Sequence, residues 1–234
     1  MKNYTLGFIC LLFLCFFILI SCKKEIKITN GKHDLSFTQL SNEWDNGIPL
    51  GNGIMGSLVW QNGQNLRISL DHVALWDLRQ TENMDSSIFS FKWVLEKWKT
   101  NQYEKVQQAF DVPYDRDPAP TKIPAGAIEI PILHLGKIKK VHLSIQDAIC
   151  DIEWENGAQL LTFISETEDV GWFRMKNMGK AMIPLFIAPG YYSDTITSES
   201  QRVGLQRLCY EKGILKKGKN EIIYIQKGWN NFEY

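Results

Sequence analysis

The stretch "SLVWQNGQNLRISL", Ser57 to Leu70, places apolar residues at alternating positions on both sides of Asn62-Gly63. This period of two is typical of a strand that buries one face, because successive side chains point to opposite sides of a sheet. Asn-Gly is the dipeptide that most readily takes the positive φ angles of a type I′ turn. We therefore predict an antiparallel hairpin centred on these two residues.

The same pattern recurs along the chain. "ICDIEWENGAQLLTFIS", residues 149–165, repeats it around Asn156-Gly157. Shorter strand candidates, separated by turn signals, are "AIEIPILHL", "KVHLSI", "WFRMKN", "MIPLFIA", "RLCYEKGIL" and "NEIIYIQKG". Many short strands at this spacing favour two sheets packed face to face. The predicted fold is mainly β: a two-sheet antiparallel β-sandwich with one or two short inserted helices.

Two amphipathic segments between the hairpins are predicted to be helical. Apolar residues recur at three- and four-residue spacing behind Ser86 and Ser87, two candidate N-cap residues. These apolar residues are Ile88, Phe91, Leu95 and Trp98, and a second short helix carries Tyr103, Val106 and Phe110. One-faced helices of this kind are expected to pack on a sheet. The proline-rich stretch from Asp111 to Pro124 is predicted to be an exposed loop.

The N-terminus has the features of an export signal. An unbroken apolar run, "LGFICLLFLCFFILI", extends from Leu6 to Ile20. It is shorter than the roughly 20 residues of a bilayer-spanning helix and fits the apolar core of a cleaved signal. Its end, "LISC", resembles the lipobox of bacterial lipoproteins, in which the cysteine, here Cys22, is lipidated. A signal anchor, or an ordinary cleavage site beside a chance cysteine, is the alternative.

The expected domain organisation follows from this signal. Residues 1–21 are a signal peptide, residues 22–34 are a linker lipidated at Cys22, and residues 35–234 are the β-sandwich domain. The aromatic ending "KGWNNFEY" suggests that this domain is truncated at its C-terminus. Lys23 stands where an aspartate would retain a lipoprotein at the inner membrane. We therefore expect a lipid anchor in the outer membrane of a Gram-negative cell envelope, on its periplasmic or its outer side.

Charge and cysteine content exclude several functions. Lysine plus arginine and aspartate plus glutamate each number 26, so no basic field attracts nucleic acid. Besides Cys22, the mature chain keeps Cys150 and Cys209, which form either a disulfide or two buried free thiols. No Cys/His spacing indicates a metal site, and no motif indicates a cofactor.

Three glycines, Gly51, Gly53 and Gly56, satisfy the letters of the dinucleotide-binding motif GxGxxG. That motif needs a helix after the glycines, because the helix N-terminus faces the pyrophosphate. Here a strand and a hairpin follow instead. The pattern therefore argues against nucleotide binding.

Acidic residues near predicted loops are candidates for glycosidic-bond chemistry, which needs two carboxylates about 5–10 Å apart. They are Glu166, Glu168 and Asp169 beside Trp172, and Asp115 and Asp117 in the proline-rich loop. Acidic runs at strand ends usually form solvated turns, and nothing in the sequence indicates a raised carboxylate pKa. We assign no catalytic residue.

The four histidines, His33, His72, His134 and His142, are scattered. His134 and His142 would face one another if their strands were adjacent. No G-x-S-x-G elbow supports a Ser-His-Asp arrangement, so a structural role is favoured for each histidine.

The segment "WDNGIPLGNGIMGSLVWQNGQNLRISLDHVALWDLR", Trp44 to Arg79, resembles the N-terminal β-sandwich of glycoside hydrolase family 95, the family of α-L-fucosidases and related enzymes. That family has a tryptophan, a "lPiGNGrlGamv" stretch, a hairpin and "iqlNedtlWsG" in this order. The matching residues are Trp44, Pro49, Gly51, Asn52, Gly53, Gly56 and Trp76. "NQYEKVQQAF" and residues 141–177 are also similar to family segments. The resemblance implies a supersandwich-like fold in which the matching residues form a loop that faces substrate or another domain.

Two departures limit what the resemblance implies. Asp71 and His72 stand where the family has an Asn-Glu-Asp run, and Ile54 replaces the arginine of "GNGRLG", so the sugar stays open. The family's catalytic acid and base lie on an (α/α)6 barrel after the sandwich, and residues 1–234 show no such helical pattern. The resemblance therefore implies a non-catalytic domain that contacts a glycan and a separate barrel. The alternative is a stand-alone glycan-binding or remnant surface lipoprotein without enzymatic role.

Overall fold

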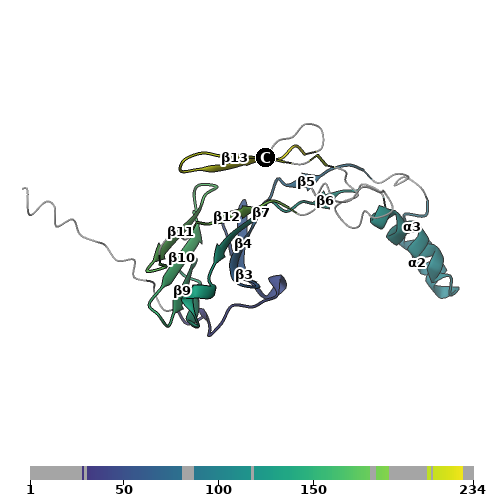
Figure 1. Ribbon diagram of the computed structural model, residues 1–234. Coiled ribbons are helices and arrows are strands. Elements are labelled where there is room, and N and C mark those ends of the chain that lie inside the picture. The colour runs from purple at the N-terminus through teal and green to yellow at the C-terminus, as the bar shows by residue number, and fades with distance from the viewer. Residues whose placement is uncertain are drawn as a thin grey trace, which may run out of the picture. The chain divides into compact units, whose positions relative to one another are not determined.

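Alternating apolar and polar residues form two antiparallel sheets of five strands each (Figure 1). The first sheet has the order β1 (Leu35–Phe37), β8 (Ile138–Ser144), β9 (Ile149–Trp154), β10 (Gln159–Ile164) and β11 (Gly171–Lys176). The second has the order β12 (Leu185–Ile187), β7 (Gly126–Pro131), β4 (Asn65–His72), β3 (Met55–Asn62) and β2 (Ile48–Gly51). The predicted mainly β fold with two antiparallel sheets is confirmed.

The computed structural model describes residues 28, 31–80, 87–116, 119–179, 183–189, 210–211 and 213–228. The chain divides into residues 1–30 and a compact unit, Gly31–Tyr234, to which every element named here belongs. The expected signal peptide and Cys22 lie outside the described residues. The unit also contains two strand pairs, β5 (Trp76–Asp77) with β6 (Thr121–Lys122) and β13 (Ile214–Lys217) with β14 (Ile222–Ile225).

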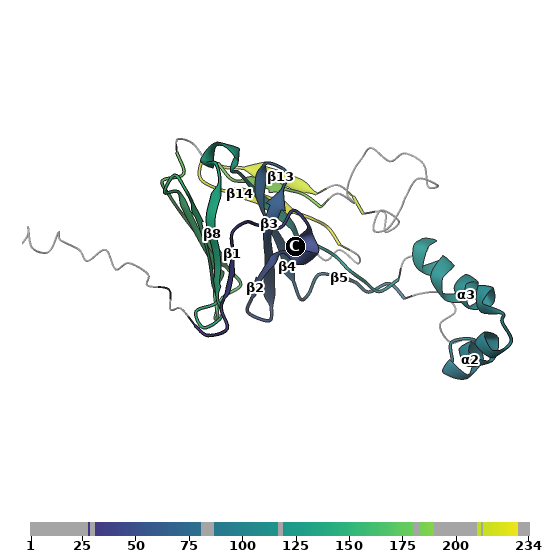
Figure 2. The same ribbon diagram turned by 90° about the horizontal axis from the view of Figure 1, so that it is seen from below.

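The two sheets form two layers that share one hydrophobic core (Figure 2). Residues paired directly across neighbouring strands point to the same face, so each row of pairs forms an apolar stripe. The stripes are Ile48, Val59 and Ile68 on one sheet and Val141, Ile152 and Leu160 on the other, all buried. Burying one such side chain contributes roughly 1.5–3 kcal/mol, so these stripes hold the layers together.

Both predicted hairpins are present, but their turns differ from the prediction. β3 pairs with β4 as far as Asn62 and Asn65, so the turn consists of Gly63 and Gln64. Gly63 has a φ of +58°, whereas Asn62 and Gln64 are not among the residues with positive φ. A type I′ turn needs positive φ at both central residues, so that assignment is wrong here. Between β9 and β10, only Gly157 of the Asn-Gly pair has positive φ (+84°), within a longer loop.

The helices have different boundaries from those predicted. α2 (Phe91–Lys99) begins after Ser90, whose Oγ accepts a hydrogen bond of 3.3 Å from the backbone N–H of Trp93. Ser90 is therefore the N-cap, in place of Ser86 or Ser87. α3 (Tyr103–Arg116) continues into the stretch predicted to be a loop. It contains one proline, Pro113, which has no backbone N–H and therefore cannot donate an intrahelical hydrogen bond.

The two helices pack on one another. The ring of Phe110 on α3 lies 4.9 Å from the ring of Phe89 and 6.3 Å from that of Trp93. α2 contains no buried residue, and the side chain of Phe91 is 81% exposed. The prediction that α2 packs on a sheet is therefore wrong for the part of the chain described. Within that part, neither helix combines the length and apolar character of a membrane-spanning segment.

Candidate functional site

Asn52 organises the turn between β2 and β3. Its Oδ1 accepts hydrogen bonds from the backbone N–H groups of Ile54, at 2.9 Å, and Met55, at 2.8 Å. Gly53 has a φ of +92°, a conformation that favours glycine. At Gly51, a Cβ would lie only 3.0 Å from the carbonyl oxygen of Met55. The glycine-rich pattern thus follows from a tight turn rather than from phosphate binding.

The Asn52 side chain also joins this turn to the loop between β10 and β11 on the other sheet. Its Nδ2 donates to the carbonyl oxygen of Ser165 at 2.9 Å and to that of Glu168 at 3.3 Å. Both amide hydrogens and both acceptor positions of the side chain are therefore used within the chain. Asn52 links the two sheets, and its role in a substrate-facing or domain-facing loop stays a prediction.

A pocket of about 380 Å³, which we call the Trp44 pocket, lies beside this hairpin. Its wall residues come from the 3₁₀ helix η1 (Trp44–Asn46), from β2, β3 and β4, and from β6 and the residues that follow it. They include Trp44, Gly56, Leu58, Ser69, Asp71 and Lys122. Trp44 is 67% exposed, which is unusual for so large an apolar side chain. The volume lies in the range of small-molecule sites, about 300–1,000 Å³.

Lys122 fixes Asp71 at the wall of the Trp44 pocket. Its ammonium group contacts Oδ1 of Asp71 and donates to the backbone carbonyls of His72 at 2.9 Å and Leu75 at 3.3 Å. Oδ1 of Asp71 also accepts a hydrogen bond of 2.7 Å from the backbone N–H of His72. The three hydrogens of Lys122 are thus committed within the chain, whereas Oδ2 of Asp71 accepts no hydrogen bond from a described residue.

Three of the acidic candidates lie together in one exposed loop. Glu166, Glu168 and Asp169 lie in the exposed loop between β10 and β11. Asp169 Oδ2 lies 3.8 Å from His72 Nε2, and such an exposed ion pair contributes about 0–1 kcal/mol. Asp115 lies in α3, and Asp117 is outside the described residues. The backbone contacts of Ser165 and Glu168 with Asn52 hold this loop against the turn between β2 and β3.

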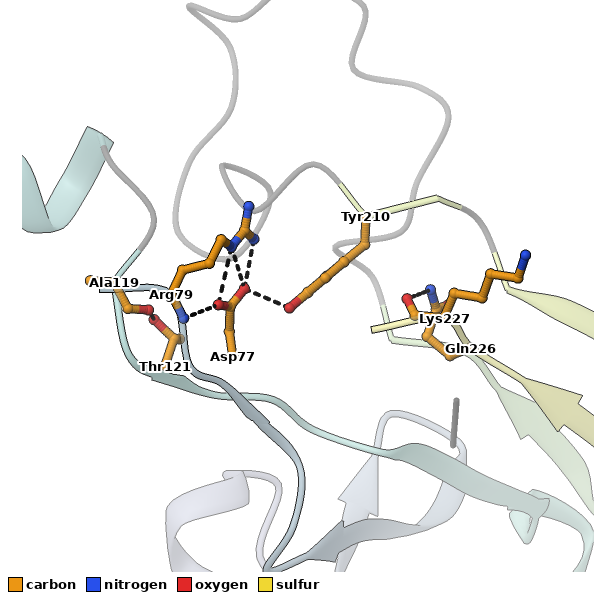
Figure 3. A network of polar contacts seen from close by, with 7 residues as sticks. All are labelled: Asp77, Arg79, Ala119, Thr121, Tyr210, Gln226 and Lys227. Carbon is orange, nitrogen blue, oxygen red and sulfur yellow. Dashed lines mark hydrogen bonds and ion pairs between the residues drawn. The ribbon is translucent and has the colours of Figure 1, made fainter. Parts of the chain in front are cut away.

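A buried network around Asp77 follows Trp76 in β5 (Figure 3). The Asp77 carboxylate accepts hydrogen bonds from Arg79 Nε and from Arg79 NH2, the latter at 2.6 Å, and one of 2.5 Å from the Tyr210 hydroxyl. Arg79 also lies over the Tyr210 ring, 5.5 Å from its centroid. Trp76 itself is 46% exposed and pairs with Lys122 in the neighbouring strand.

The contacts of this network favour the charged forms of both Asp77 and Arg79. Burial alone would raise the pKa of Asp77, but the hydrogen bonds from Arg79 and Tyr210 hold it below its ordinary value. The hydrogen bond to Asp77 raises the pKa of Arg79, and burial raises the pKa of Tyr210. The network therefore keeps a buried carboxylate ionised and joins Tyr210 to β5.

The structure places His134 and His142 in different kinds of element. The chain turns after β7 into a 3₁₀ helix, η2 (Leu133–Leu135), where His134 Nε2 lies 3.0 Å from the carbonyl oxygen of Met178. His142 lies on β8, and its Nδ1 is 3.1 Å from the Ser36 hydroxyl. The condition of adjacent strands, under which the two histidines would face one another, is therefore not met.

His142 is also part of a buried link to the residues before β1. Its Nε2 lies 3.3 Å from Asp34 Oδ2. Backbone N–H groups of Gly31 and Ile145 donate to the Asp34 carboxylate and lower its pKa. Ser36 lies on an edge strand and not at a strand-to-helix elbow, so the three side chains attach β1 to its sheet. A structural role for His142 follows from this geometry.

Cys150 is fully buried in β9, where burial raises the pKa of its thiol to about 12. It is a free thiol in this structure. Its proposed partner, Cys209, lies outside the described residues, so the disulfide stays a prediction.

No protein-family model matches this chain, and no curated protein matches it. Within the described residues, no group of three or more histidine, cysteine, aspartate or glutamate side chains is arranged to hold a metal ion.

Proposed function

We propose that the chain is a non-catalytic β-sandwich domain of a carbohydrate-active enzyme that resembles family 95 glycoside hydrolases, and that it is inactive alone. Such an enzyme would be an α-L-fucosidase or a related exo-glycosidase acting on complex glycans. The observation that carries this proposal is the exposure of two tryptophans, Trp44 and Trp76, which carry the resemblance. Exposed aromatic side chains of this size commonly mark a binding surface. In this proposal they face a glycan or an (α/α)6 barrel.

The exposed apolar side chains of the two helices also support a contact with another domain. Large apolar side chains on α2 and at the start of α3 are exposed, namely Phe91, Trp98 and Tyr103. A surface of this kind is typical of contacts with another domain. The barrel would be the partner that covers it.

Reconstitution tests this proposal. The mature chain with Cys22→Ser is produced alone and together with the polypeptide encoded directly after the Tyr234 codon. We expect no hydrolysis of aryl fucosides or aryl galactosides by the chain alone, and a stable, active complex in the second case. Hydrolysis by the chain alone would contradict the proposal, as would a downstream region that encodes no barrel.

Matched variants make the test specific to the proposed surface. Trp44→Ala and Trp76→Ala are expected to reduce the activity or stability of the complex. Trp172→Ala removes a tryptophan of similar exposure, 55%, from β11 on the other sheet and serves as the control. Equal losses in all three variants would show that the two motif tryptophans have no special role.

A second candidate, a stand-alone glycan-binding lipoprotein, is favoured by the Trp44 pocket. It predicts glycan binding without any partner, on a chain anchored through Cys22 to the outer membrane. Labelling of growing cells with radioactive palmitate, followed by membrane fractionation, tests the anchor. We expect Cys22→Ser to abolish the label, and a label that persists in this variant would contradict lipidation at Cys22.

A further inference from the structure

We propose that the Trp44 pocket is a subsite for one neutral pyranose ring. The inference rests on the proposed function only for its choice of a carbohydrate as the ligand. The pocket, its exposed indole and its free carboxylate oxygen are features of the described residues themselves.

Trp44 supplies the apolar wall of this subsite. The indole is a rigid flat surface, and because Trp44 is 67% exposed, most of this surface is not buried in the protein core. A pyranose ring carries C–H groups on one face and hydroxyls around its edge. Stacking of the C–H face on Trp44 would cover the indole while the hydroxyls stay free for hydrogen bonds.

Asp71 supplies the polar contact. Its Oδ1 is occupied by Lys122 and by the backbone N–H of His72, which fixes the orientation of the carboxylate. Its Oδ2 is therefore held in place with its acceptor positions available to ligand hydroxyls. Hydrogen bonds to an ionised acceptor are stronger than those between neutral groups, so this oxygen favours a ligand rich in hydroxyl donors.

The charge of the pocket selects a neutral sugar. Lys122 balances the charge of Asp71, and its own hydrogens are committed to Asp71 and to backbone carbonyls. Among the described residues that line the pocket, none other than Lys122 carries a cation that could bind a sugar carboxylate. A uronic acid would instead bring its carboxylate toward Asp71, which disfavours its binding.

Gly56 leaves the space next to Asp71 open. The two residues are paired across β3 and β4, and a Cβ at position 56 would lie 3.9 Å from Cβ of Asp71, an ordinary contact. A larger side chain there would project on the same face as Asp71. Gly56→Val therefore fills the proposed subsite with a residue type that strands accept well.

Nuclear magnetic resonance of the mature chain with Cys22→Ser tests the subsite. The probe is methyl β-D-galactopyranoside in the millimolar range, and D-galacturonate is the anionic comparison. The indole N–H signal of Trp44 is identified by its loss in Trp44→Phe. We expect a saturable shift of this signal with the galactoside, and binding about tenfold weaker or more with galacturonate.

Variants complete the experiment. Asp71→Asn and Gly56→Val should each weaken galactoside binding about tenfold or more, whereas Trp172→Ala should bind as the parent chain does. The spectrum of each variant shows whether it is folded. If Asp71→Asn does not fold, Gly56→Val provides the test of the subsite. An unmoved Trp44 signal, equal binding of galacturonate, or unchanged binding in a folded Gly56→Val would overturn the subsite. An active complex with a barrel that shows no galactoside response would overturn the subsite alone and leave the domain assignment standing.

Discussion

The hydroxyl of Tyr210 donates a hydrogen bond of 2.5 Å to the carboxylate of Asp77, although 133 residues separate them in the sequence. Arg79 contacts the same carboxylate at 2.6 Å. Because Asp77 is completely buried, these contacts replace the hydration that it loses on folding. They join Tyr210 to β5.

Breaking this network should destabilise the fold. We expect Asp77→Asn to cost about 3 kcal/mol, because it leaves the Arg79 charge without its partner. Tyr210→Phe should cost about 1 kcal/mol, since Arg79 still contacts the carboxylate. Urea unfolding followed by tryptophan fluorescence measures both. A larger loss of unfolding free energy in Tyr210→Phe than in Asp77→Asn would contradict the inference that the Asp77 carboxylate contributes most to the stability of this network.

The same network makes the stability depend on pH. The pKa of Asp77 is lower in the folded chain than its ordinary value, so its ionised form stabilises the fold above the pKa of the unfolded chain, about 3.9. This contribution is lost as the pH falls through the folded pKa. Urea titrations between about pH 2 and pH 7 should therefore show a smaller acid-induced loss of stability in Asp77→Asn than in the parent chain.

Asp151 should behave in the opposite way. Burial raises the pKa of its carboxyl group, so the ionised form costs stability above the folded pKa, and the cost disappears as the pH falls below the unfolded value. Asn at this position can still accept the hydrogen bond of 2.8 Å from Gln159. We therefore expect Asp151→Asn to stabilise the fold at pH 7 and to give no gain near pH 3. A loss of stability at pH 7 would show that contacts with neighbouring charges outweigh burial.

Gly126 should not tolerate a side chain. Its φ is +112°, and a Cβ there would lie 2.8 Å from the carbonyl oxygen of Ile187 and 2.9 Å from the Phe186 ring. Gly126→Ala therefore combines backbone strain with displacement of β12, and a cost of about 2–4 kcal/mol is expected. Gly136→Ala is the control, because its φ of +74° is also positive but its surroundings are open. Equal melting temperatures for the two variants would exclude the contact with β12 as the cause.

Cys150 should be inert in the folded chain. Its thiol is buried with a pKa of about 12, and the thiolate is the reactive form. The mature chain with Cys22→Ser and Cys209→Ser should therefore release no colour from Ellman's reagent until it is unfolded. Reaction of this variant in the folded state would contradict the burial of Cys150. Unfolding of the Cys22→Ser chain, which keeps Cys209, without reductant distinguishes the two interpretations of the cysteines: free Cys150 and Cys209 both react, whereas a disulfide leaves neither reactive.

Local sequence signals predicted the local parts of this fold. The alternation in residues 57–70 and 149–165 identified both hairpins, because the two-residue period of a strand's side chains appears in the sequence as alternating apolar and polar residues. The position of the turn between β3 and β4 was not predicted correctly. Moving a two-residue turn by one position along the chain leaves the same side chains on each face of the hairpin, so the alternation does not distinguish the two positions. The helix periodicity identified the apolar face of α2 but not its packing partner, which depends on tertiary contacts.

Local sequence signals did not predict the side-chain contacts of the candidate site. The motif residue Trp44 and the glycine-rich stretch were singled out from the sequence, although the exposure of Trp44 was not predicted. Lys122 lies in a proline-rich stretch that gives no sign of its contact with Asp71. Asp77 and Tyr210 likewise carry no local pattern that would join them. Contacts between side chains that are far apart in sequence follow from strand order and register, which the sequence pattern alone does not provide.

The bond from Asn52 to Ser165 spans 113 residues and joins turns of two different hairpins. Hairpins close within microseconds from local contacts, whereas this bond forms only after both sheets have met. We therefore expect it to form late in folding, so that its loss in Asn52→Ala accelerates unfolding and leaves the refolding rate nearly unchanged. Asn52 would then determine how long the folded state lasts rather than how fast it is reached.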